Sequence, residues 1–214
     1  TLEDVVGKEV VVIGCEMGGV TPLARIGANV IGVDIADEAV VMLNHAIDRE
    51  GLRGNAQALV MNGEDLELPD QSVDVICCTG VLHHLDVEKA AGSWSRTLRP
   101  SGRVTMIEPM AWHPIVAMYR LLTPSMRTPD EHPLTPVDIR ILKRHFGKVS
   151  VHGYVLTSVL SVIGTYIPNA QGLTAGCFRF LEKFDKFLLK CLPFLVYFCW
   201  TSVIELEEPL YGKE

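Results

Sequence analysis

Residues Glu9–Gly19, with the sequence EVVVIGCEMGG, decide the fold that we expect for this chain. Glu9–Ile13 is a mostly β-branched run that predicts a buried strand, and the glycines after it predict a tight turn. A short helix is predicted over Thr21–Ile26 and a second buried strand over Asn29–Val33. A strand, a glycine-rich turn, a helix and another strand form the first unit of a parallel sheet.

The same alternation of strands and helices continues as far as residue 109. Apolar residues at helical spacing end before Gly51, and the sequence Arg-Pro-Ser-Gly at 99–102 predicts a turn. We expect a doubly wound, Rossmann-like α/β fold, with a mostly parallel sheet and helices on both faces. The remaining predicted elements are a helix over Asp37–Glu50, strands over Ala56–Met61 and Val73–Cys78, a helix over Val87–Leu98 and a strand over Arg103–Ile107.

The second half of the chain does not continue this regular alternation of strands and helices. We divide the single domain into a cofactor-binding core over 1–109, a proline-rich insert or lid over 110–147, and a strand-helix-strand segment over 148–214 that completes the sheet. The last strand is expected to be antiparallel. The predicted elements are helices over Ile115–Leu122, Val137–His145 and Phe178–Leu192, and strands over Val149–Leu156 and Phe198–Leu206.

The apolar tail has two interpretations. Phe178–Trp200 either closes the core, or forms with Tyr154–Ile167 a greasy surface that admits an apolar substrate or contacts a membrane peripherally. The stretch Leu188–Ile204 is interrupted by Lys190 and Pro193, so it does not predict a membrane span.

Composition excludes several classes of protein. The 214 residues carry 19 Lys plus Arg against 26 Asp plus Glu, a net charge of -7, which gives no basic footprint for nucleic acid. A hydrophobic content of 48% excludes disorder. The six cysteines contain no CxxC pair and predict reduced core residues, and the N-terminus has no leader pattern, so a cytoplasmic location is expected. The composition leaves open a monomer or a homodimer.

The glycine-rich turn constrains the cofactor. In an open α/β sheet this turn lies at the carboxyl end of the strands, where ligands bind. A dinucleotide fingerprint needs a glycine where this chain has Glu16, and a carboxylate there repels a pyrophosphate. S-adenosylmethionine carries no phosphate and has a positive sulfonium and ammonium, so Glu16 is compatible with it.

These residues resemble the class I S-adenosylmethionine-dependent methyltransferases, in particular bacterial enzymes similar to those of quinone biosynthesis. The resemblance covers most of Val6–Glu108 and includes the run LPDQSVDVICCTGVLHHL. It implies S-adenosyl-L-methionine as cofactor and S-adenosyl-L-homocysteine as product, with Asp34 on the ribose hydroxyls and Asn62 on the adenine. The implied cofactor-binding residues are Gly14, Cys15, Glu16, Gly18, Asp34, Ile35, Asn62, Gly63, Glu64, Thr79 and Gly80.

The chain departs from the family pattern in the first loop. Val12 stands where the family has an acid, and Glu16 stands where it has a glycine. One hypothesis is that Glu16 supplies the missing charge. The alternative is a methyltransferase fold with an eroded cofactor loop, which acts as a binding protein or as a non-methylating catalyst such as a cyclase.

Methyl transfer is an in-line displacement, so the protein mainly supplies alignment and a dry pocket. A hydroxyl or amine acceptor also benefits from a base, and the candidates are His83, His84 and Glu108, with hydrogen bonding, capping or lid anchoring as the structural alternatives. The spacing of histidines and acids fits no metal pattern. The leading prediction is a methyltransferase for a small, apolar acceptor, methylated on O, N or C. Candidate acceptor-binding residues are Trp112, His113, Tyr119, Arg127 and His132.

Overall fold

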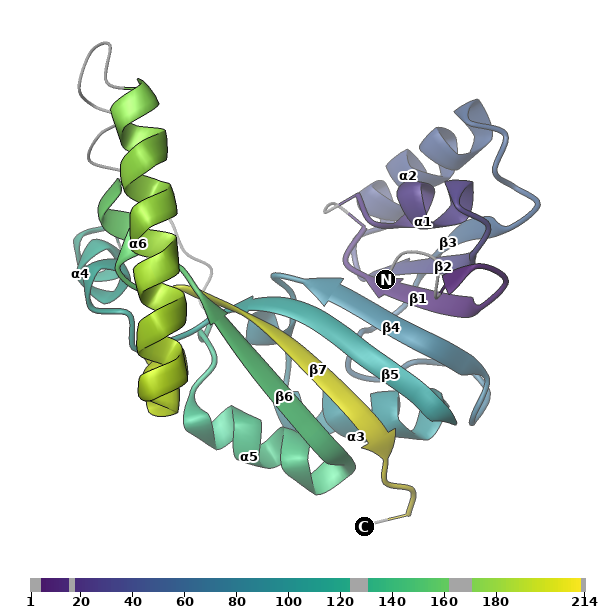
Figure 1. Ribbon diagram of the computed structural model, residues 1–214. Helices are drawn as coiled ribbons and strands as arrows, with labels where there is room; N and C mark the ends of the chain where they lie inside the picture. The colour runs from purple at the N-terminus through teal and green to yellow at the C-terminus, as the bar shows by residue number, and fades with distance from the viewer. Residues whose placement is uncertain (1–4, 16–17, 124–130, 162–170, 213–214) are drawn as a thin grey trace.

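The computed structural model describes residues 5–15, 18–123, 131–161 and 171–212. Strands and helices alternate through its first half, as Figure 1 shows. The strands are β1 (Glu9–Ile13), β2 (Asn29–Asp34), β3 (Ala56–Val60), β4 (Val73–Thr79), β5 (Leu98–Pro109), β6 (Phe146–Tyr154) and β7 (Thr201–Pro209). The helices are α1 (Val20–Arg25), α2 (Asp37–Arg49), α3 (Val87–Thr97), α4 (Pro114–Leu122), α5 (Pro136–His145) and α6 (Gln171–Cys191), with short 3-10 helices η2 (Leu82–His84) and η5 (Pro193–Phe198).

The strands form one seven-stranded sheet in the order β3-β2-β1-β4-β5-β7-β6. The first five strands are parallel, and Val12 of β1 lies between Gly32 of β2 and Cys77 of β4. The last strand, β7, runs antiparallel to β5 on one side and to β6 on the other. This is the mixed, mostly parallel Rossmann-like sheet predicted from the sequence, and its order reverses between β1 and β4, which is where such sheets bind ligands.

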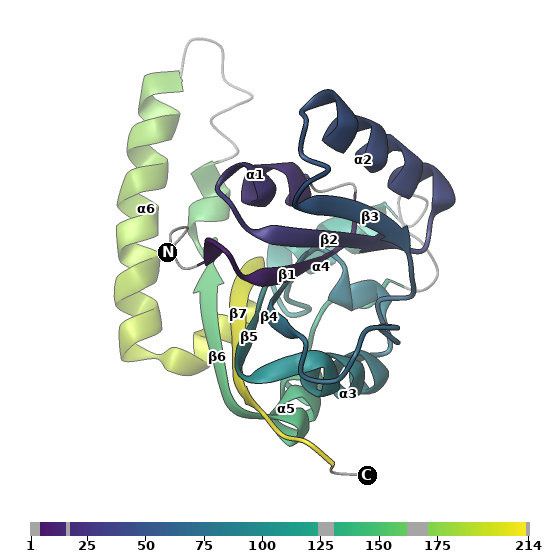
Figure 2. The same cartoon turned by 90° about the vertical axis from the view of Figure 1, so that its right-hand side faces the viewer.

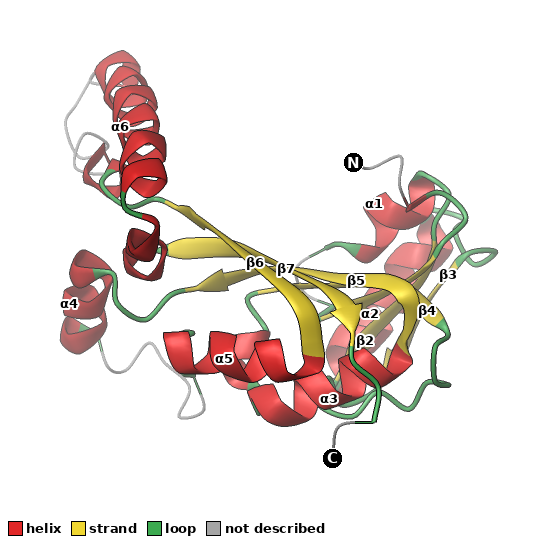
Figure 3. Cartoon of the chain, turned by 60° about the horizontal axis from the view of Figure 1, so that its bottom comes forward, coloured by secondary structure: helices red, strands yellow, loops and turns green. Residues whose placement is uncertain are grey.

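Helices cover both faces of the sheet. One apolar layer joins α1 and α2 to the strands and includes Ala24 and Leu43, while a second layer contains Trp94 of α3 and Leu142 of α5. Figure 3 shows α3 and α5 side by side on one side of the strands, with α1 on the other. The amphipathic helix expected over Val137–His145 is α5, which packs against α3 and β6.

Several element boundaries differ from the prediction, among them those of β5, α6 and β7. Strand β5 begins at Leu98, which pairs with Val73 before a register shift, so the predicted turn over 99–102 is an irregularity within the strand. Helix α6 begins at Gln171, earlier than its apolar pattern indicated. Strand β7 begins only at Thr201, because the preceding residues 193–198 form η5.

Most of the apolar side chains of α6 do not join the core. Helix α6 stands at one end of the sheet in Figures 1 and 2, and its Phe180, Phe184 and Phe187 are exposed. The prediction that the six cysteines are core residues is therefore wrong for Cys177 and Cys191, which are exposed on α6; all six cysteines are free thiols. Within the described ranges, no helix combines the length and the apolar character that a membrane crossing requires.

Candidate functional site

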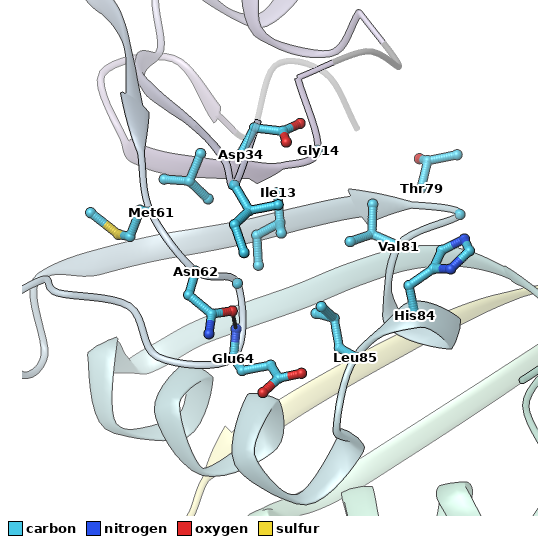
Figure 4. Close-up of a pocket in the computed structure, with 14 residues that line it drawn as sticks. Ile13, Gly14, Asp34, Met61, Asn62, Glu64, Thr79, Val81, His84 and Leu85 are labelled. Atoms are coloured by element: carbon cyan, nitrogen blue, oxygen red, sulfur yellow. Dashed lines mark hydrogen bonds between the residues drawn. The ribbon is translucent and has the colours of Figure 1, made fainter. Parts of the chain in front are cut away.

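A cavity of about 580 Å³ opens at the carboxyl ends of β1, β2, β3 and β4 (Figure 4). Its volume lies within the range of small-molecule sites, and its place beside the reversal of strand order is where open α/β sheets bind their ligands. The lining residues are Ile13, Gly14, Val33, Asp34, Ile35, Met61, Asn62, Gly63, Glu64, Thr79, Gly80, Val81, His84 and Leu85.

The turn after β1 needs a glycine at position 14. Gly14 has a φ of 90°, a conformation that residues with a Cβ rarely adopt. A Cβ built there would lie 2.7 Å from Cγ2 of Val81, so the two loops approach too closely for a side chain. The Gly14 amide donates to the Val33 carbonyl at 2.9 Å, which fixes the turn to β2. The turn thus forms a wall of the cavity with backbone alone.

Asp34 ends β2 with its carboxylate at the cavity. Its Oδ2 accepts a 2.8 Å hydrogen bond from the amide of Cys15, and its Oδ1 accepts a 3.0 Å bond from the amide of Ala36. An ionised carboxylate has about four acceptor positions, so roughly one remains on each oxygen. Two acceptors held side by side in a fixed orientation match the two hydroxyls of a vicinal diol.

Asn62 is held in one orientation by its own loop. Its Oδ1 accepts from the Glu64 amide at 2.9 Å, which leaves the Nδ2 donor available to a ligand. The adjacent Gly63 carbonyl accepts a 2.8 Å bond from Nε1 of Trp94, which is fully buried. Glu64 in turn accepts from the Asp86 amide at 2.9 Å. The loop after β3 is therefore anchored to α3.

Glu108 organises the loop that follows β4. The side chain is fully buried, and its Oε1 accepts from the amides of Val81 at 3.0 Å and Leu82 at 2.8 Å. Its Oε2 lies 2.7 Å from Nδ1 of His83. Every oxygen of this carboxyl group is thus engaged inside the protein, and Glu108 does not line the cavity. The predicted role of Glu108 as a base does not fit this geometry; the residue positions the loop.

His84 is the histidine that faces the cavity, whereas His83 is buried against Glu108. Desolvation lowers the pKa of His84 below its usual value, and the neighbouring His83 lowers it further. Glu131 has the opposite effect on His84, and it also pairs with Arg120. A neutral imidazole at a cavity wall can accept a proton near pH 7.

A second hollow adjoins the cavity. His84 and Leu85 line both spaces, and His132 and Asp138 lie in the second one. His132 is thus the one predicted acceptor-binding residue that the described structure brings beside His84.

The other predicted acceptor-binding residues of the described chain do not line this cavity or the second hollow. His113 is buried and caps α4: Nδ1 accepts from the Val116 amide at 3.2 Å, so Nε2 donates to the Leu156 carbonyl at 3.0 Å. The ring of Trp112 packs on Tyr197, at 6.3 Å between centroids, and on Phe198. Tyr119 is exposed on α4 and is absent from the cavity wall. Arg127 lies outside the described residues.

Most of the predicted cofactor-binding residues meet at the cavity, with three exceptions. Cys15 contributes its amide to Asp34, while its thiol is buried; burial, followed by Asp34, raises its pKa to about 11. Gly18 has a φ of 69° and lies outside the wall. Glu16 falls outside the described residues, so its role stays a prediction. Sequence reasoning did not assign the apolar wall, Ile13, Val33, Met61, Val81 and Leu85, because apolar strand ends look like core.

The candidate metal set of Glu108, His113 and His132 is not assembled. Glu108 is engaged with His83, and His113 is engaged with the Leu156 carbonyl. Across the described ranges, no group of three or more His, Cys, Asp or Glu residues is arranged to hold a metal ion.

Comparison with known proteins assigns a class to this fold and cavity. Residues 11–106 match the model of the family described as "Methyltransferase domain". The chain is 34% identical over 101 residues to a ubiquinone biosynthesis O-methyltransferase of Cupriavidus pinatubonensis, covering 46% of this chain and 40% of the relative. It is 35% identical over 81 residues to the ubiquinone/menaquinone biosynthesis C-methyltransferase UbiE of Citrobacter koseri, covering 37% and 32%. The chain thus spans less than half the length of these curated relatives.

The fold extends over nearly the whole chain. The geranyl diphosphate C-methyltransferase from Streptomyces coelicolor, solved with S-adenosyl-L-homocysteine, superposes with a TM-score of 0.60 at 15% identity and covers 96% of this chain and 76% of the other. This family match and this fold support a class I methyltransferase architecture, in which the cofactor is S-adenosylmethionine.

Proposed function

We propose that this chain is an S-adenosylmethionine-dependent methyltransferase for a small, apolar acceptor. The observation that carries the proposal is the pairing of Asp34 and Asn62 across one cavity, because one presents two fixed acceptors and the other a free amide donor. A nucleoside offers a diol and a base with ring nitrogens, which complement these groups. The cavity fits such a ligand in volume and chemistry.

Different parts of the cavity then bind different parts of the cofactor. Asp34 holds the ribose hydroxyls, and Asn62 holds the base. Thr79 and Gly80, at the carboxyl end of β4, border the part of the cavity left for the amino-acid portion. When bound, S-adenosylmethionine supplies an activated methyl group, so alignment and exclusion of water are the main requirements on the protein.

The acceptor is proposed to enter beside His84. This residue lines both the cavity and the second hollow, and its lowered pKa keeps the ring neutral near pH 7. A ring nitrogen of His84 takes the proton of a hydroxyl or amine acceptor. Val81 and Leu85 make this wall apolar, which supports an apolar acceptor. The curated relatives include enzymes named for O- and for C-methylation, so the methylated atom is left unassigned.

The alternative function retains the fold without methyl transfer. It is favoured by Val12, which stands in place of the family's acid and is buried in the apolar layer beneath α1. With an eroded loop, the cavity would serve a binding protein or a catalyst that only shapes its substrate.

Calorimetric titration with S-adenosylhomocysteine separates the two functions. We expect micromolar binding by the unaltered chain and a ten- to hundredfold weaker affinity for Asp34→Asn, which loses a charge-assisted acceptor. Asp48→Asn is the matched control, because Asp48 pairs with Arg53 on the surface of α2. Circular dichroism checks that each variant is folded. A folded chain that binds neither S-adenosylhomocysteine nor S-adenosylmethionine would favour the alternative.

A further inference from the structure

Helix α6 carries an apolar row that is exposed in the described part of the chain. Cys177, Phe180, Phe184, Phe187 and Cys191 recur at alternating intervals of three and four residues, which places them on one face of the helix. All five are exposed, and Phe180 and Phe187 reach 70% and 61% exposure. Soluble surfaces rarely leave so many aromatic side chains together in water, so this face is built to contact something.

A row of cationic side chains runs along α6 beside the apolar row. Arg179, Lys183, Lys186 and Lys190 lie roughly 110° around the helix axis from it, and all four are exposed. On the described part of α6, the only exposed or partly exposed acid is Glu182, which pairs with Lys186 at 2.6 Å. The chain as a whole carries a net charge of -7, so this concentration of positive charge runs against its overall composition.

The opposite face of α6 attaches the helix to the rest of the protein. Asp185 is buried and accepts hydrogen bonds from the amides of Leu156 at 3.1 Å, Thr157 at 2.8 Å and Ser158 at 3.1 Å. This anchor fixes the rotation of α6 about its axis, and with it the direction in which the apolar row points. Because α6 connects the end of β6 to the start of β7, it lies at the same end of the sheet as the carboxyl end of β5.

Further apolar side chains are exposed at this end of the molecule. Helix α4 follows the carboxyl end of β5 and exposes Met118, Leu121 and Leu122, and Phe194 of η5 is also exposed. Figures 1 and 3 both place α4 and α6 at this end, away from α2 and β3. It is also the end at which the cavity of Asp34 and Asn62 opens.

We propose that α6 is an interfacial helix that docks the protein on the surface of an anionic lipid bilayer. The apolar row inserts at the boundary between headgroups and acyl chains, and the row of cations meets the phosphates of anionic lipids. A second copy of the chain suits this face less well, because α6 offers no acidic row to pair with the four cations. Charge complementarity therefore favours an anionic bilayer over a second copy of the chain.

The first test measures binding to vesicles by cosedimentation. Vesicles of phosphatidylglycerol mixed with phosphatidylcholine are compared with vesicles of phosphatidylcholine alone. The unaltered chain is expected to sediment with the anionic vesicles and to remain in solution with the neutral ones. Phe180→Ala/Phe187→Ala should lower partitioning at least tenfold. The matched control is Val41→Ala/Met42→Ala, which removes two exposed apolar side chains from α2.

The second test addresses charge. Lys183→Gln/Lys190→Gln should lower binding to anionic vesicles by about thirtyfold. Added salt should likewise weaken the binding of the unaltered chain to these vesicles. Arg140→Gln/Lys143→Gln removes two exposed cations from α5 and should leave binding unchanged. All of these positions are exposed, so the variants are expected to fold, which circular dichroism verifies.

The native thiols supply a site-specific readout that is independent of methyl transfer. Cys177 and Cys191 lie within the apolar row, so anionic vesicles should slow their alkylation by a water-soluble maleimide at least fivefold. Equal alkylation with and without vesicles, or equal sedimentation of the α6 and α2 variants, would overturn the proposal. A dimer in sedimentation velocity that Phe180→Ala/Phe187→Ala abolishes would overturn it in favour of a second copy.

Discussion

The Oε2 atom of Glu108 lies 2.7 Å from Nδ1 of His83, and both side chains are buried. The other oxygen of the same carboxyl group accepts hydrogen bonds from the amides of Val81, which lines the cavity, and of Leu82. One carboxyl group on β5 thus sets the backbone of the β4 loop and directs His83 away from the cavity. The adjacent His84 is thereby left to face the ligand.

Substitutions of Glu108 should show how strongly the loop after β4 depends on this carboxyl group. Glu108→Leu leaves two buried amides and a histidine without their acceptor, so we expect a loss of about 3 kcal/mol in the free energy of unfolding. Glu108→Gln retains one carbonyl oxygen and should lose about 1 kcal/mol. Urea denaturation followed by circular dichroism measures both values. Equal stability of Glu108→Leu and the unaltered chain would show that the loop does not depend on this carboxyl group.

His84 should titrate below the usual histidine range. Burial disfavours its charged form, so the pKa of the folded state is lowered relative to the unfolded state. As the pH falls through about 6.5, His84 is protonated in the unfolded state before it is protonated in the folded state. The free energy of unfolding therefore decreases as the pH falls from about 6.5 to the lower pKa of His84 in the folded state. NMR titration of the histidine ring signals, assigned with His84→Gln, measures the shift. A His84 that titrates above 6.5 would contradict this lowering of its pKa by burial.

Gly14 and Gly18 of the first loop should respond differently to substitution by alanine. Both have positive φ, so each substitution carries a backbone cost of about 1 kcal/mol. Only at Gly14 does an added Cβ also meet Val81, at 2.7 Å, whereas nothing lies within 4 Å at Gly18. Gly14→Ala should therefore weaken binding of S-adenosylhomocysteine tenfold or more, and Gly18→Ala should weaken it far less. Isothermal titration measures both, and equal losses would argue against this close approach of the loops.

Asp185 should control the attachment of α6. Asp185→Ala removes the acceptor of three backbone amides, so hydrogen exchange should accelerate across α6 and 156–158 while α3 keeps its protection. Although burial raises the pKa of Asp185, the hydrogen bonds from Thr157 and Ser158 outweigh it, and the net pKa is lowered. Its stabilising effect is then fully present above pH 3.8 and is lost as the pH falls through the lower folded value. Unchanged exchange in α6 would contradict this anchoring.

Thiol reactivity should divide the cysteines into two sets. Cys177 and Cys191 are exposed and should react with iodoacetamide within minutes at pH 8. Burial raises the pKa of Cys15 to about 11 and that of Cys199 to about 12, so these thiols should stay unmodified in the folded chain. Peptide mass spectrometry identifies the modified positions, and alkylation of all six in urea is the control. Rapid modification of Cys15 in the folded chain would contradict its burial beside Asp34.

The parallel half of the fold was predictable because its signals are local. The β-branched run before Gly14 and the helical spacing over 37–50 set the boundaries of β1 and α2 almost to the residue. The cofactor side of the cavity followed for the same reason, because Asp34 ends β2 and Asn62 closely follows the end of β3, so both reach one edge of the sheet.

The remaining features depend on contacts that are distant along the chain. His113 and His132 looked equivalent in the sequence, yet the Leu156 carbonyl engages the first, while the second lies in the hollow beside His84. The apolar pattern of α6 resembled that of a core helix, and only Asp185 shows which face is attached. Periodicity identifies a face without identifying what covers it.

The place of β7 in the sheet has a consequence for synthesis on the ribosome. Strand β6 leaves the ribosome well before β7, yet it joins the sheet only through β7, which lies between it and β5. Until the last residues of β7 emerge, the edge of β5 is open and β6 has no partner in the sheet, which is the condition under which nascent chains associate wrongly. Truncation within 201–209 should therefore yield an aggregating chain even though every residue of the cavity is already present.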